Sequence, residues 1–249
     1  RDQDRAIGWA RDHGINFFDT AASYGNGVSE ENLGRALNGN SDGLVISTKV
    51  GLSNDDLSDV YGAITRSLDA SLARLRLDHV DIFQLHNTLG RTDFRGTLTI
   101  DQIMDAVVPA FDKLRDTGKV RFLGFTAKGE ADDVHKLVSC GVFHSAQVFY
   151  NLLVPSAGEP IAATYPSDDY KLLLETAKDH GVGAIGVRVL AGGALSGSTA
   201  RHPLGMRDVT PIGSETDYAT DVKRGLAFMP LVEAGHAGSL IELAIRYVI

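Results

Sequence analysis

Six short apolar runs that alternate with amphipathic segments constrain the fold of this chain most strongly. Most of the runs are apolar throughout their middle, which is typical of strands that a parallel sheet buries on both faces. The segments between them, among them Leu57–Leu77 and Ile100–Thr117, repeat apolar residues every three or four positions, as amphipathic helices do. This alternation predicts an α/β protein with a parallel sheet. The six runs are Ile15–Asp19, Leu44–Lys49, Val80–His86, Arg121–Thr126, Ser145–Tyr150 and Gly183–Arg188.

Polar residues at the ends of these runs favour one form of parallel sheet. Asp19, Lys49 and His86 each close a run. An open, doubly wound sheet and a closed barrel both fit six strands, but only a barrel brings the ends of all its strands around one mouth. We therefore expect a (β/α)8 TIM barrel that forms a single domain over residues 1–249. Because such a barrel needs eight strands, we expect its first and last strands to lie beyond the present ends, which leaves both ends of the domain incomplete.

The composition disfavours several classes of partner. A formal net charge of -8 argues against binding to nucleic acid or to an anionic membrane, since both need a basic surface. Cys140 is the only cysteine, so no internal disulfide can form, and we expect a reducing, cytoplasmic location. The composition does not determine the oligomeric state. Five histidines lack the spacing of metal ligands, and we assign no metal; they are His79, His135, His144, His202 and His236.

Two further histidines stand at the ends of predicted helices. His13 precedes Gly14, and His180 precedes Gly181. Glycine is the usual residue where a helix ends in a left-handed cap, and a histidine in the last turn can bond to the final carbonyl groups. We therefore expect both histidines to cap helices and not to bind a ligand.

Four side chains at or just beyond strand ends are candidates for proton-transfer chemistry. Asp19 ends one run, Tyr24 follows on the next loop, and Lys49 and His86 end two later runs. A phenol is a poor proton donor at neutral pH unless a neighbouring ammonium stabilises its anion. A carboxylate can hold that ammonium in place, and an imidazole can orient a substrate oxygen. Such a set can protonate an alkoxide while hydride reaches a carbonyl, and a nicotinamide would have to supply the hydride.

Each of the four residues has an ordinary structural explanation when it is taken alone. Asp19 could cap a turn, Tyr24 could be a half-buried aromatic residue, and Lys49 could be a solvated strand end. His86 could be a core histidine with its hydrogen bonds satisfied. Chance, however, gives no reason for these four residue types to occur at successive strand ends. Their combination favours a catalytic site.

The segments that carry these residues resemble the aldo-keto reductase family. The strand-two signature of that family resembles GINFFDTAASYGNGVSEENLG, its lysine strand resembles ISTKVG, and its histidine strand resembles DIFQLHN. The resemblance continues through VRFLGFTA, AQVFYNLL and RVLAGGALSG, and so covers nearly the whole chain. It implies a (β/α)8 barrel that binds NADPH, or less often NADH, without a Rossmann domain. The absence of a GxGxxG fingerprint in this sequence agrees with that implication.

The resemblance also implies roles for individual residues. Tyr24 would be the general acid, or the general base in the oxidative direction. Lys49 and Asp19 would tune it, and His86 would position the carbonyl. Thr126 and Gln147 match positions that hold the nicotinamide carboxamide. A loop that lies along the cofactor pyrophosphate matches Arg188, Leu190 and Gly193.

Two positions depart from the pattern common in the family. Ala127 stands where many members have asparagine, which removes one amide contact, and Val187 stands where many have an aromatic ring over the nicotinamide. The elements that hold the adenosine phosphate should follow Ile249, so these residues do not distinguish NADP from NAD. Long connections follow three strands, and in the first of them Arg91, Phe94 and Arg95 could line a substrate pocket or a solvated loop. The long connections are Asn87–Thr99, Asn151–Pro166 and Val189–Thr216.

Three functions follow from these patterns. The leading hypothesis is an NAD(P)(H)-dependent oxidoreductase for an aldehyde, ketone or sugar, or for the corresponding alcohol. A second is an aldolase in which Lys49 forms a Schiff base with the substrate. A third is a regulatory or redox-sensing barrel that binds the cofactor but turns over slowly. The sequence does not identify the substrate or the direction of the reaction.

Overall fold

The computed structural model describes residues 2–90, 96–200 and 209–249. These residues form two compact units, Arg1–Ala146 and Gln147–Ile249, and each unit is described by itself. The single domain expected over residues 1–249 stays a prediction. In the part of the chain that the structure describes, no helix combines the length and apolar character needed to cross a bilayer.

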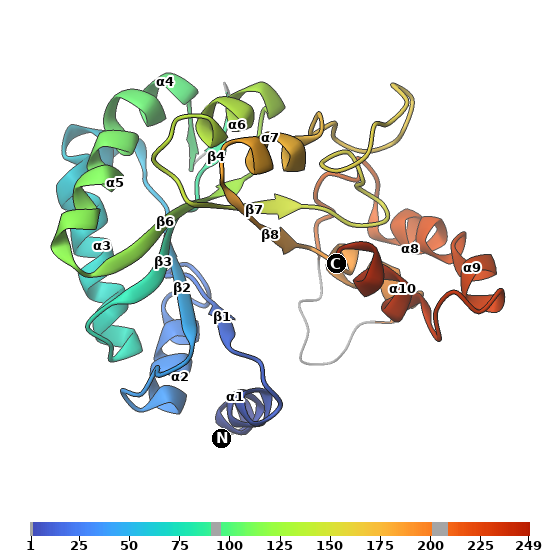
Figure 1. Cartoon of the computed structure of the whole chain (residues 1–249), viewed down its shortest axis with the longest axis horizontal. Helices are drawn as coiled ribbons and strands as arrows, with labels where there is room; N and C mark the ends of the chain where they lie inside the picture. The colour runs from blue at the N-terminus through green and yellow to red at the C-terminus, as the bar shows by residue number, and fades with distance from the viewer. Residues whose placement is uncertain (1, 91–95, 201–208) are drawn as a thin grey trace. The chain divides into compact units, whose positions relative to one another are not determined.

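The first unit is built on parallel strands that pair in the order of the chain. Strand β1 (Phe17–Asp19) pairs with β2 (Val45–Val50), β2 pairs with β3 (Val80–Leu85), and β3 pairs with β6 (Val120–Ala127). Figure 1 shows these four strands side by side. The α/β class with a parallel sheet is confirmed. Strand β1 covers only the end of the predicted run, because Gly14 adopts a positive φ of 84° and Ile15 stays half exposed.

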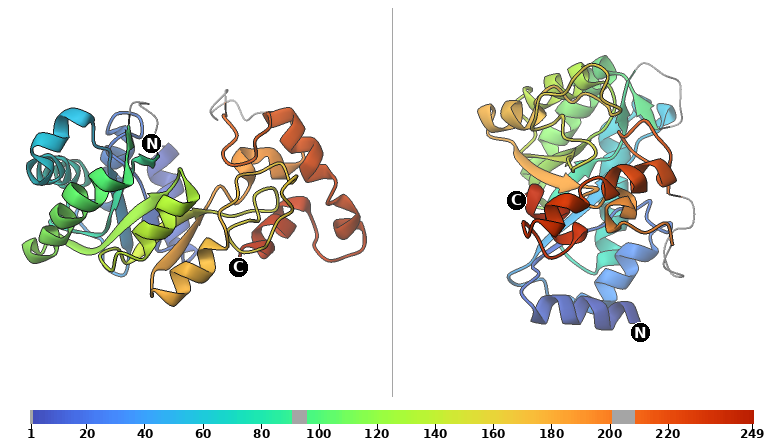
Figure 2. Two further views of the ribbon diagram at one scale, coloured as in Figure 1. Left: turned by 90° about the horizontal axis from the view of Figure 1, so that it is seen from above. Right: turned by 90° about the vertical axis from the view of Figure 1, so that its right-hand side faces the viewer.

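Helices of the first unit cover one face of these strands. Figure 1 shows α2 (Val28–Leu37), α3 (Val60–Leu75) and α5 (Val108–Leu114) along the outside of the sheet. The left view of Figure 2 also shows α3 and α5 next to each other. The apolar residues that recur along α3, such as Ile64 and Leu68, are buried. Phe83 of β3 stacks on Phe111 of α5 with ring centroids 5.7 Å apart. The remaining elements of this unit are α1 (Asp2–Asp12), η1 (Asn54–Ser58), β4 (Thr88–Leu89), β5 (Thr97–Leu98) and α6 (Ala131–Val138).

The predicted helix over Ile100–Thr117 is helical throughout but irregular. It begins as α4 (Ile100–Gln102), widens into a π-turn at Ile103–Val107, and ends through α5 and a 3₁₀ turn at Arg115–Thr117. Pro109 lies in the first turn of α5. Because proline has no backbone N–H, it cannot continue the regular helical ladder, and the chain accommodates it by widening the turn before it.

The second unit contains the end of β7 (Ser145–Phe149), which lies next to β8 (Gly183–Val187). The long connection after β8 is tied to helix α8 (Tyr218–Leu226) by a buried carboxylate. Asp221 accepts hydrogen bonds from the hydroxyl groups of Ser214 and Thr216, and Arg224 donates to the carbonyl of Leu153 at 3.0 Å. The helical elements of this unit are α7 (Leu173–Asp179), η4 (Ala191–Ser196), α8 (Tyr218–Leu226), α9 (Met229–Glu233) and α10 (Leu240–Tyr247).

Both predicted histidine caps are confirmed. The Nδ1 atom of His13 lies 2.7 Å from the carbonyl oxygen of Trp9, and that of His180 lies 2.9 Å from the carbonyl oxygen of Thr176. The glycines that follow them have φ values of 84° and 67°. The helices before β1 and β8 therefore end by the same mechanism, in which the histidine bonds to a last-turn carbonyl and the glycine reverses the chain.

Close packing of α2 on α3 predicts opposite effects for two glycine substitutions. A Cβ atom at Gly34 would lie 2.3 Å from the carbonyl oxygen of Arg74, whereas a Cβ atom at Gly8 of α1 would meet nothing within 4 Å. We expect Gly34→Ala to lower the free energy of unfolding by about 1–3 kcal/mol through overpacking. Gly8→Ala should raise it by up to about 1 kcal/mol, because alanine favours the helix. Urea unfolding measures both, and a neutral Gly34→Ala would contradict this packing.

Candidate active site

The first unit brings together the four candidate catalytic residues. Asp19 is the last residue of β1, Lys49 lies near the end of β2, and His86 directly follows β3. Tyr24 lies in the short loop between β1 and α2. Because the strands are parallel and pair in register, their carboxyl ends meet at one edge of the sheet. The predicted clustering of these residues is therefore present in the structure.

Lys49 is the centre of this cluster. Its side chain is buried, with 1% of the residue exposed. The Nζ atom donates to Asp19 Oδ2 at 2.5 Å, to the carbonyl oxygen of Thr20 at 2.7 Å and to the hydroxyl of Tyr24 at 3.3 Å. An ammonium group has three N–H donors, so these contacts use all of them. The arrangement holds a positive charge directly beside the phenol oxygen.

Tyr24 is accessible although its ammonium neighbour is not. It is 41% exposed, and it lines a cleft of about 520 Å³ together with Phe18, Asp19 and Val28. The edge of its ring faces the ring of His86 at a centroid distance of 5.8 Å. Most other residues that line this cleft belong to α1 and α2, and neither Lys49 nor His86 is among them.

His86 is uncharged at neutral pH. Burial is the main cause that lowers its pKa from 6.5 to about 4, and the positive charge of Lys49 contributes in the same direction. A neutral imidazole carries one N–H donor and one acceptor nitrogen. His86 can thus donate a hydrogen bond to an oxygen atom beside Tyr24 without adding a second positive charge to the site.

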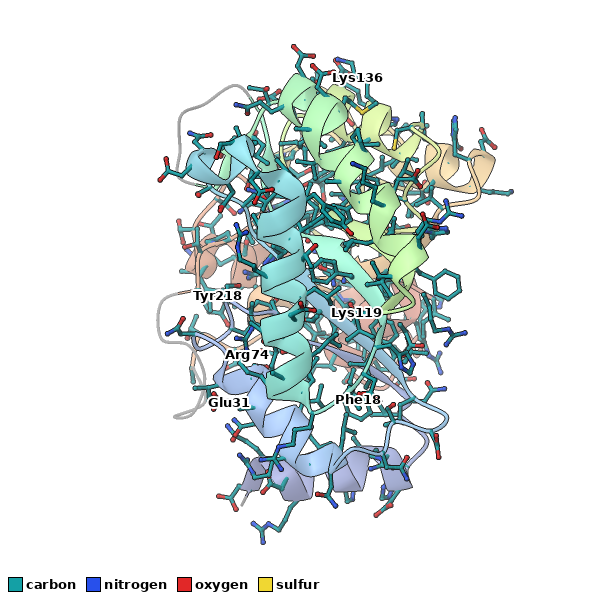
Figure 3. All side chains as sticks on the ribbon, turned by 90° about the vertical axis from the view of Figure 1, so that its left-hand side faces the viewer. Phe18, Glu31, Arg74, Lys119, Lys136 and Tyr218 are labelled. Atoms are coloured by element: carbon teal, nitrogen blue, oxygen red, sulfur yellow. The ribbon has the colours of Figure 1, made fainter. Side chains whose placement is uncertain are left out.

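A buried carboxylate outside the predicted set fastens the loop of Tyr24 to the sheet. Glu30 of α2 is fully buried, and it accepts from Thr48 Oγ1 at 2.5 Å and from Arg74 Nε at 2.6 Å. Figure 3 shows Arg74 of α3 beside helix α2. Thr20 also donates to the hydroxyl of Ser29 at 2.8 Å, which links the two ends of the same loop. The sequence marks Ser29 and Glu30 only as the start of a helix, and their burial appears only in the tertiary structure.

Gln84 of β3 is a second residue that the sequence analysis did not select. Its Nε2 atom donates to Asp19 Oδ1 at 3.2 Å. One signal could have found it, because Gln84 stands two positions before His86, and residues two apart on a strand point to the same face.

The candidate cofactor residues are divided between the two units. Thr126 of β6 belongs to the first unit and Gln147 of β7 to the second, and both are buried polar residues. The second unit brings together the other three in the turn after β8, where Arg188 and Gly193 have φ values of 59° and 108°. Leu190 accepts from the backbone N–H of Gly193 at 2.8 Å. The candidate pocket residues Arg91, Phe94 and Arg95 lie outside the described residues, as does His202.

The turn after β8 has features that suit a phosphate group. A Cβ atom at Gly192 would lie 2.9 Å from the Arg188 Nη1 atom, so this glycine lets the backbone approach the guanidinium group. The carbonyl of Arg188 accepts from Asn151 Nδ2 at 3.0 Å, which fixes the start of the turn. Guanidinium groups are well suited to bind phosphate oxygens. The residues present in the second unit therefore fit a pyrophosphate.

Comparison with known proteins adds evidence of a different kind. The family model described as "Aldo/keto reductase family" matches residues 2–249. L-galactose dehydrogenase from Arabidopsis thaliana is 40% identical over 117 residues, which are 45% of this chain and 34% of that protein. A putative voltage-gated potassium channel subunit beta from Schizosaccharomyces pombe is 33% identical over 197 residues, which are 76% of this chain and 52% of that protein.

A solved structure supports the same relationship. The aldo/keto reductase from Klebsiella pneumoniae in complex with NADP and acetate is 25% identical with a TM-score of 0.57, and the match covers 77% of this chain and 59% of that one. The chain spans between a third and two thirds of the length of these relatives. The match over residues 2–249 shows that this chain belongs to the aldo-keto reductase family, whose fold is the (β/α)8 barrel.

Proposed function

We propose that this chain carries the catalytic site of an oxidoreductase that transfers hydride between NADP(H) and a carbonyl or alcohol substrate. The observation that carries the proposal is the contact of the Lys49 ammonium with the hydroxyl of Tyr24 at 3.3 Å, in a cluster completed by Asp19 and His86. Membership of the aldo-keto reductase family supports the same chemistry.

In this proposal Tyr24 moves the proton. A bound nicotinamide would supply hydride to the carbonyl carbon, and the carbonyl oxygen would then gain negative charge. Tyr24 donates its phenolic proton to that oxygen, and the ammonium of Lys49 stabilises the phenolate that remains. Asp19 holds the ammonium through its 2.5 Å contact. In the oxidative direction the phenolate removes the proton from the alcohol.

His86 positions the substrate oxygen in the same scheme. Its low pKa keeps the imidazole neutral, so it can donate one hydrogen bond to the carbonyl oxygen and direct that oxygen toward Tyr24. A charged imidazolium would compete with the ammonium for the phenolate. The neutral form adds no second positive charge to the site.

The cofactor proposal is NADP(H), with NAD(H) as the alternative. The family resemblance assigns the nicotinamide carboxamide to Thr126 of the first unit and Gln147 of the second, and the pyrophosphate to the turn that contains Arg188, Leu190 and Gly193. The guanidinium of Arg188 beside Gly192 supports this placement. The relative from Klebsiella pneumoniae was solved in complex with NADP, which supports the choice of cofactor.

The substrate class proposed is a small aldehyde, ketone or sugar. Membership of the aldo-keto reductase family supports small carbonyl compounds as the class of substrate. The similarity to L-galactose dehydrogenase favours the inclusion of sugars. The protein would act in the cytoplasm, in agreement with its single cysteine.

A second candidate function is a regulatory subunit that binds cofactor with little turnover. The similarity to a putative potassium channel subunit beta is the observation that favours it. Under this alternative, NADPH would bind tightly while no aldehyde, ketone or sugar would be reduced at an appreciable rate. The Schiff-base alternative is disfavoured, because the three hydrogen bonds of Lys49 stabilise its ammonium form, which is not nucleophilic.

Loss of the phenolic proton should abolish most of the activity. We expect Tyr24→Phe to lower kcat for NADPH-dependent aldehyde reduction by about 10²–10⁴-fold, the usual contribution of general acid catalysis. Tyr61→Phe, which changes an exposed phenol on α3, should keep the wild-type rate. NADPH oxidation at 340 nm across a panel of aldehydes and sugars measures both, together with the Kd for NADPH from its fluorescence. Undiminished turnover in Tyr24→Phe would remove this residue from the mechanism.

The low pKa of His86 predicts a pH dependence of stability. The unfolded chain protonates this imidazole near pH 6.5, whereas the folded protein resists protonation until about pH 4. The unfolded state therefore binds more protons in this window, and stability falls as the pH falls through it. We expect the wild type to lose about 1–2 kcal/mol more than His86→Gln between pH 7 and pH 4, allowing for partial exposure of the ring. Urea unfolding at a series of pH values tests this, and parallel curves would contradict it.

A further inference from the structure

Gln84 lies on β3, the strand next to that of Lys49, and its side chain contacts Asp19. Its side chain is fully buried on β3, and its Cα atom pairs in register with those of Lys49 on β2 and Gly124 on β6. The Nε2 atom of Gln84 donates to Asp19 Oδ1 at 3.2 Å and to Ser47 Oγ at 2.6 Å. The other oxygen of Asp19, Oδ2, is the one that accepts from Lys49.

We propose that Gln84 is a positioning residue, which holds the Asp19 carboxylate by the oxygen that Lys49 does not use. The proposal rests on the proposed function, in which Lys49 acts on Tyr24. The last torsion of an aspartate side chain, between a tetrahedral and a planar carbon, is loosely restrained. A carboxylate held at one oxygen can therefore rotate. Held at both oxygens, Asp19 keeps Oδ2 directed at the Lys49 ammonium and so keeps that ammonium directed at Tyr24.

The chemistry of the two groups determines which way the amide points. An ionised carboxylate only accepts hydrogen bonds, so the nitrogen of the Gln84 amide must face Asp19. The Oε1 atom consequently points away, and it has no hydrogen-bond partner among the described residues. A buried acceptor of this kind costs stability. Packing alone would be better served here by an apolar side chain, and the contact with Asp19 explains the glutamine.

The neighbouring strand confines Gln84 from the other side. A Cβ atom at Gly124 would lie 3.0 Å from Gln84 Cγ and 2.5 Å from Ser145 Oγ. Glycine at this position leaves room for the glutamine, and the packed backbone around it removes alternative positions for the side chain. The Gln84 side chain thus packs against β6 on one side and bonds to Asp19 on the other.

The test is a double-mutant cycle between Gln84 and Asp19. Gln84→Met keeps the volume of the side chain but removes its donor. We expect kcat for NADPH-dependent reduction to fall about tenfold, the effect of losing one hydrogen bond to a charged group, while KM and the Kd for NADPH stay within twofold. In an Asp19→Ala background, the same substitution should change kcat by less than about twofold, because the partner is already gone.

Ser47→Ala provides the matched control. It removes the other acceptor of the same amide and leaves the contact with Asp19, so kcat should stay within about threefold of the wild type. If Gln84 only packed, Gln84→Met and Ser47→Ala would both change stability. Neither would then lower kcat while KM stays the same. Wild-type kcat in Gln84→Met, or an equal loss in the presence and absence of Asp19, would overturn the proposal.

A second measurement needs neither cofactor nor substrate. Urea unfolding gives the change in the equilibrium constant of unfolding for Gln84→Met, for Asp19→Ala and for the double variant. If the two side chains interact, the change in the double variant should differ from the product of the two single changes by a factor of about 5–20. Gln84→Leu replaces Gln84→Met if the latter does not fold. Multiplicative effects would overturn the pairing. A wild-type protein that binds no NADPH and reduces no substrate would overturn the proposed function instead, and the unfolding cycle would still decide whether Gln84 holds Asp19.

Discussion

A buried ammonium group is the constraint on which the candidate site depends. Removing Lys49 from water carries a desolvation cost that is offset only when a counter-charge and further acceptors surround the group in good geometry. The protein meets this requirement with Asp19, the carbonyl of Thr20 and the hydroxyl of Tyr24. These three acceptors come from the end of β1 and the loop after it. The same contacts that compensate the buried charge therefore assemble the groups that would transfer a proton.

The register of the strands turns this local requirement into a network. Asp19 pairs with Ser47, and Lys49 pairs with Gln84, so adjacent strands present their polar side chains at matching heights. The amide nitrogen of Gln84 donates to both members of the first pair, Asp19 and Ser47, and so links the two pairs. Behind the loop of Tyr24, the buried carboxylate of Glu30 joins α2 to β2 and α3. Positioning of the phenol is thus shared between a strand interior and a helix start.

The candidate site residues of the second unit are arranged by backbone conformation, whereas those of the first unit are arranged by side-chain charge. Positive φ values recur through the turn after β8, at Arg188, Ala191, Gly192 and Gly193. Non-glycine residues adopt such angles at a cost, which the surrounding contacts must offset. Here Asn151 bonds to the carbonyl of Arg188 and, through its own oxygen, accepts from the backbone of the following loop. A buried amide therefore holds open a turn that offers a guanidinium group and close backbone to an anion.

The sequence by itself determined the six strands of the parallel sheet, most helices, both histidine caps and the placement of three candidate residues at strand ends. Apolar runs, helical periodicity and Gly14 or Gly181 act locally, and parallel strands must bring Asp19, Lys49 and His86 to one edge. Only the tertiary structure decided that Glu30 is buried, that Gln84 holds Asp19, and that His86 stays neutral. These properties arise from contacts between residues far apart in the chain. Burial, charge and hydrogen-bond geometry at such contacts depend on packing, which no local pattern encodes.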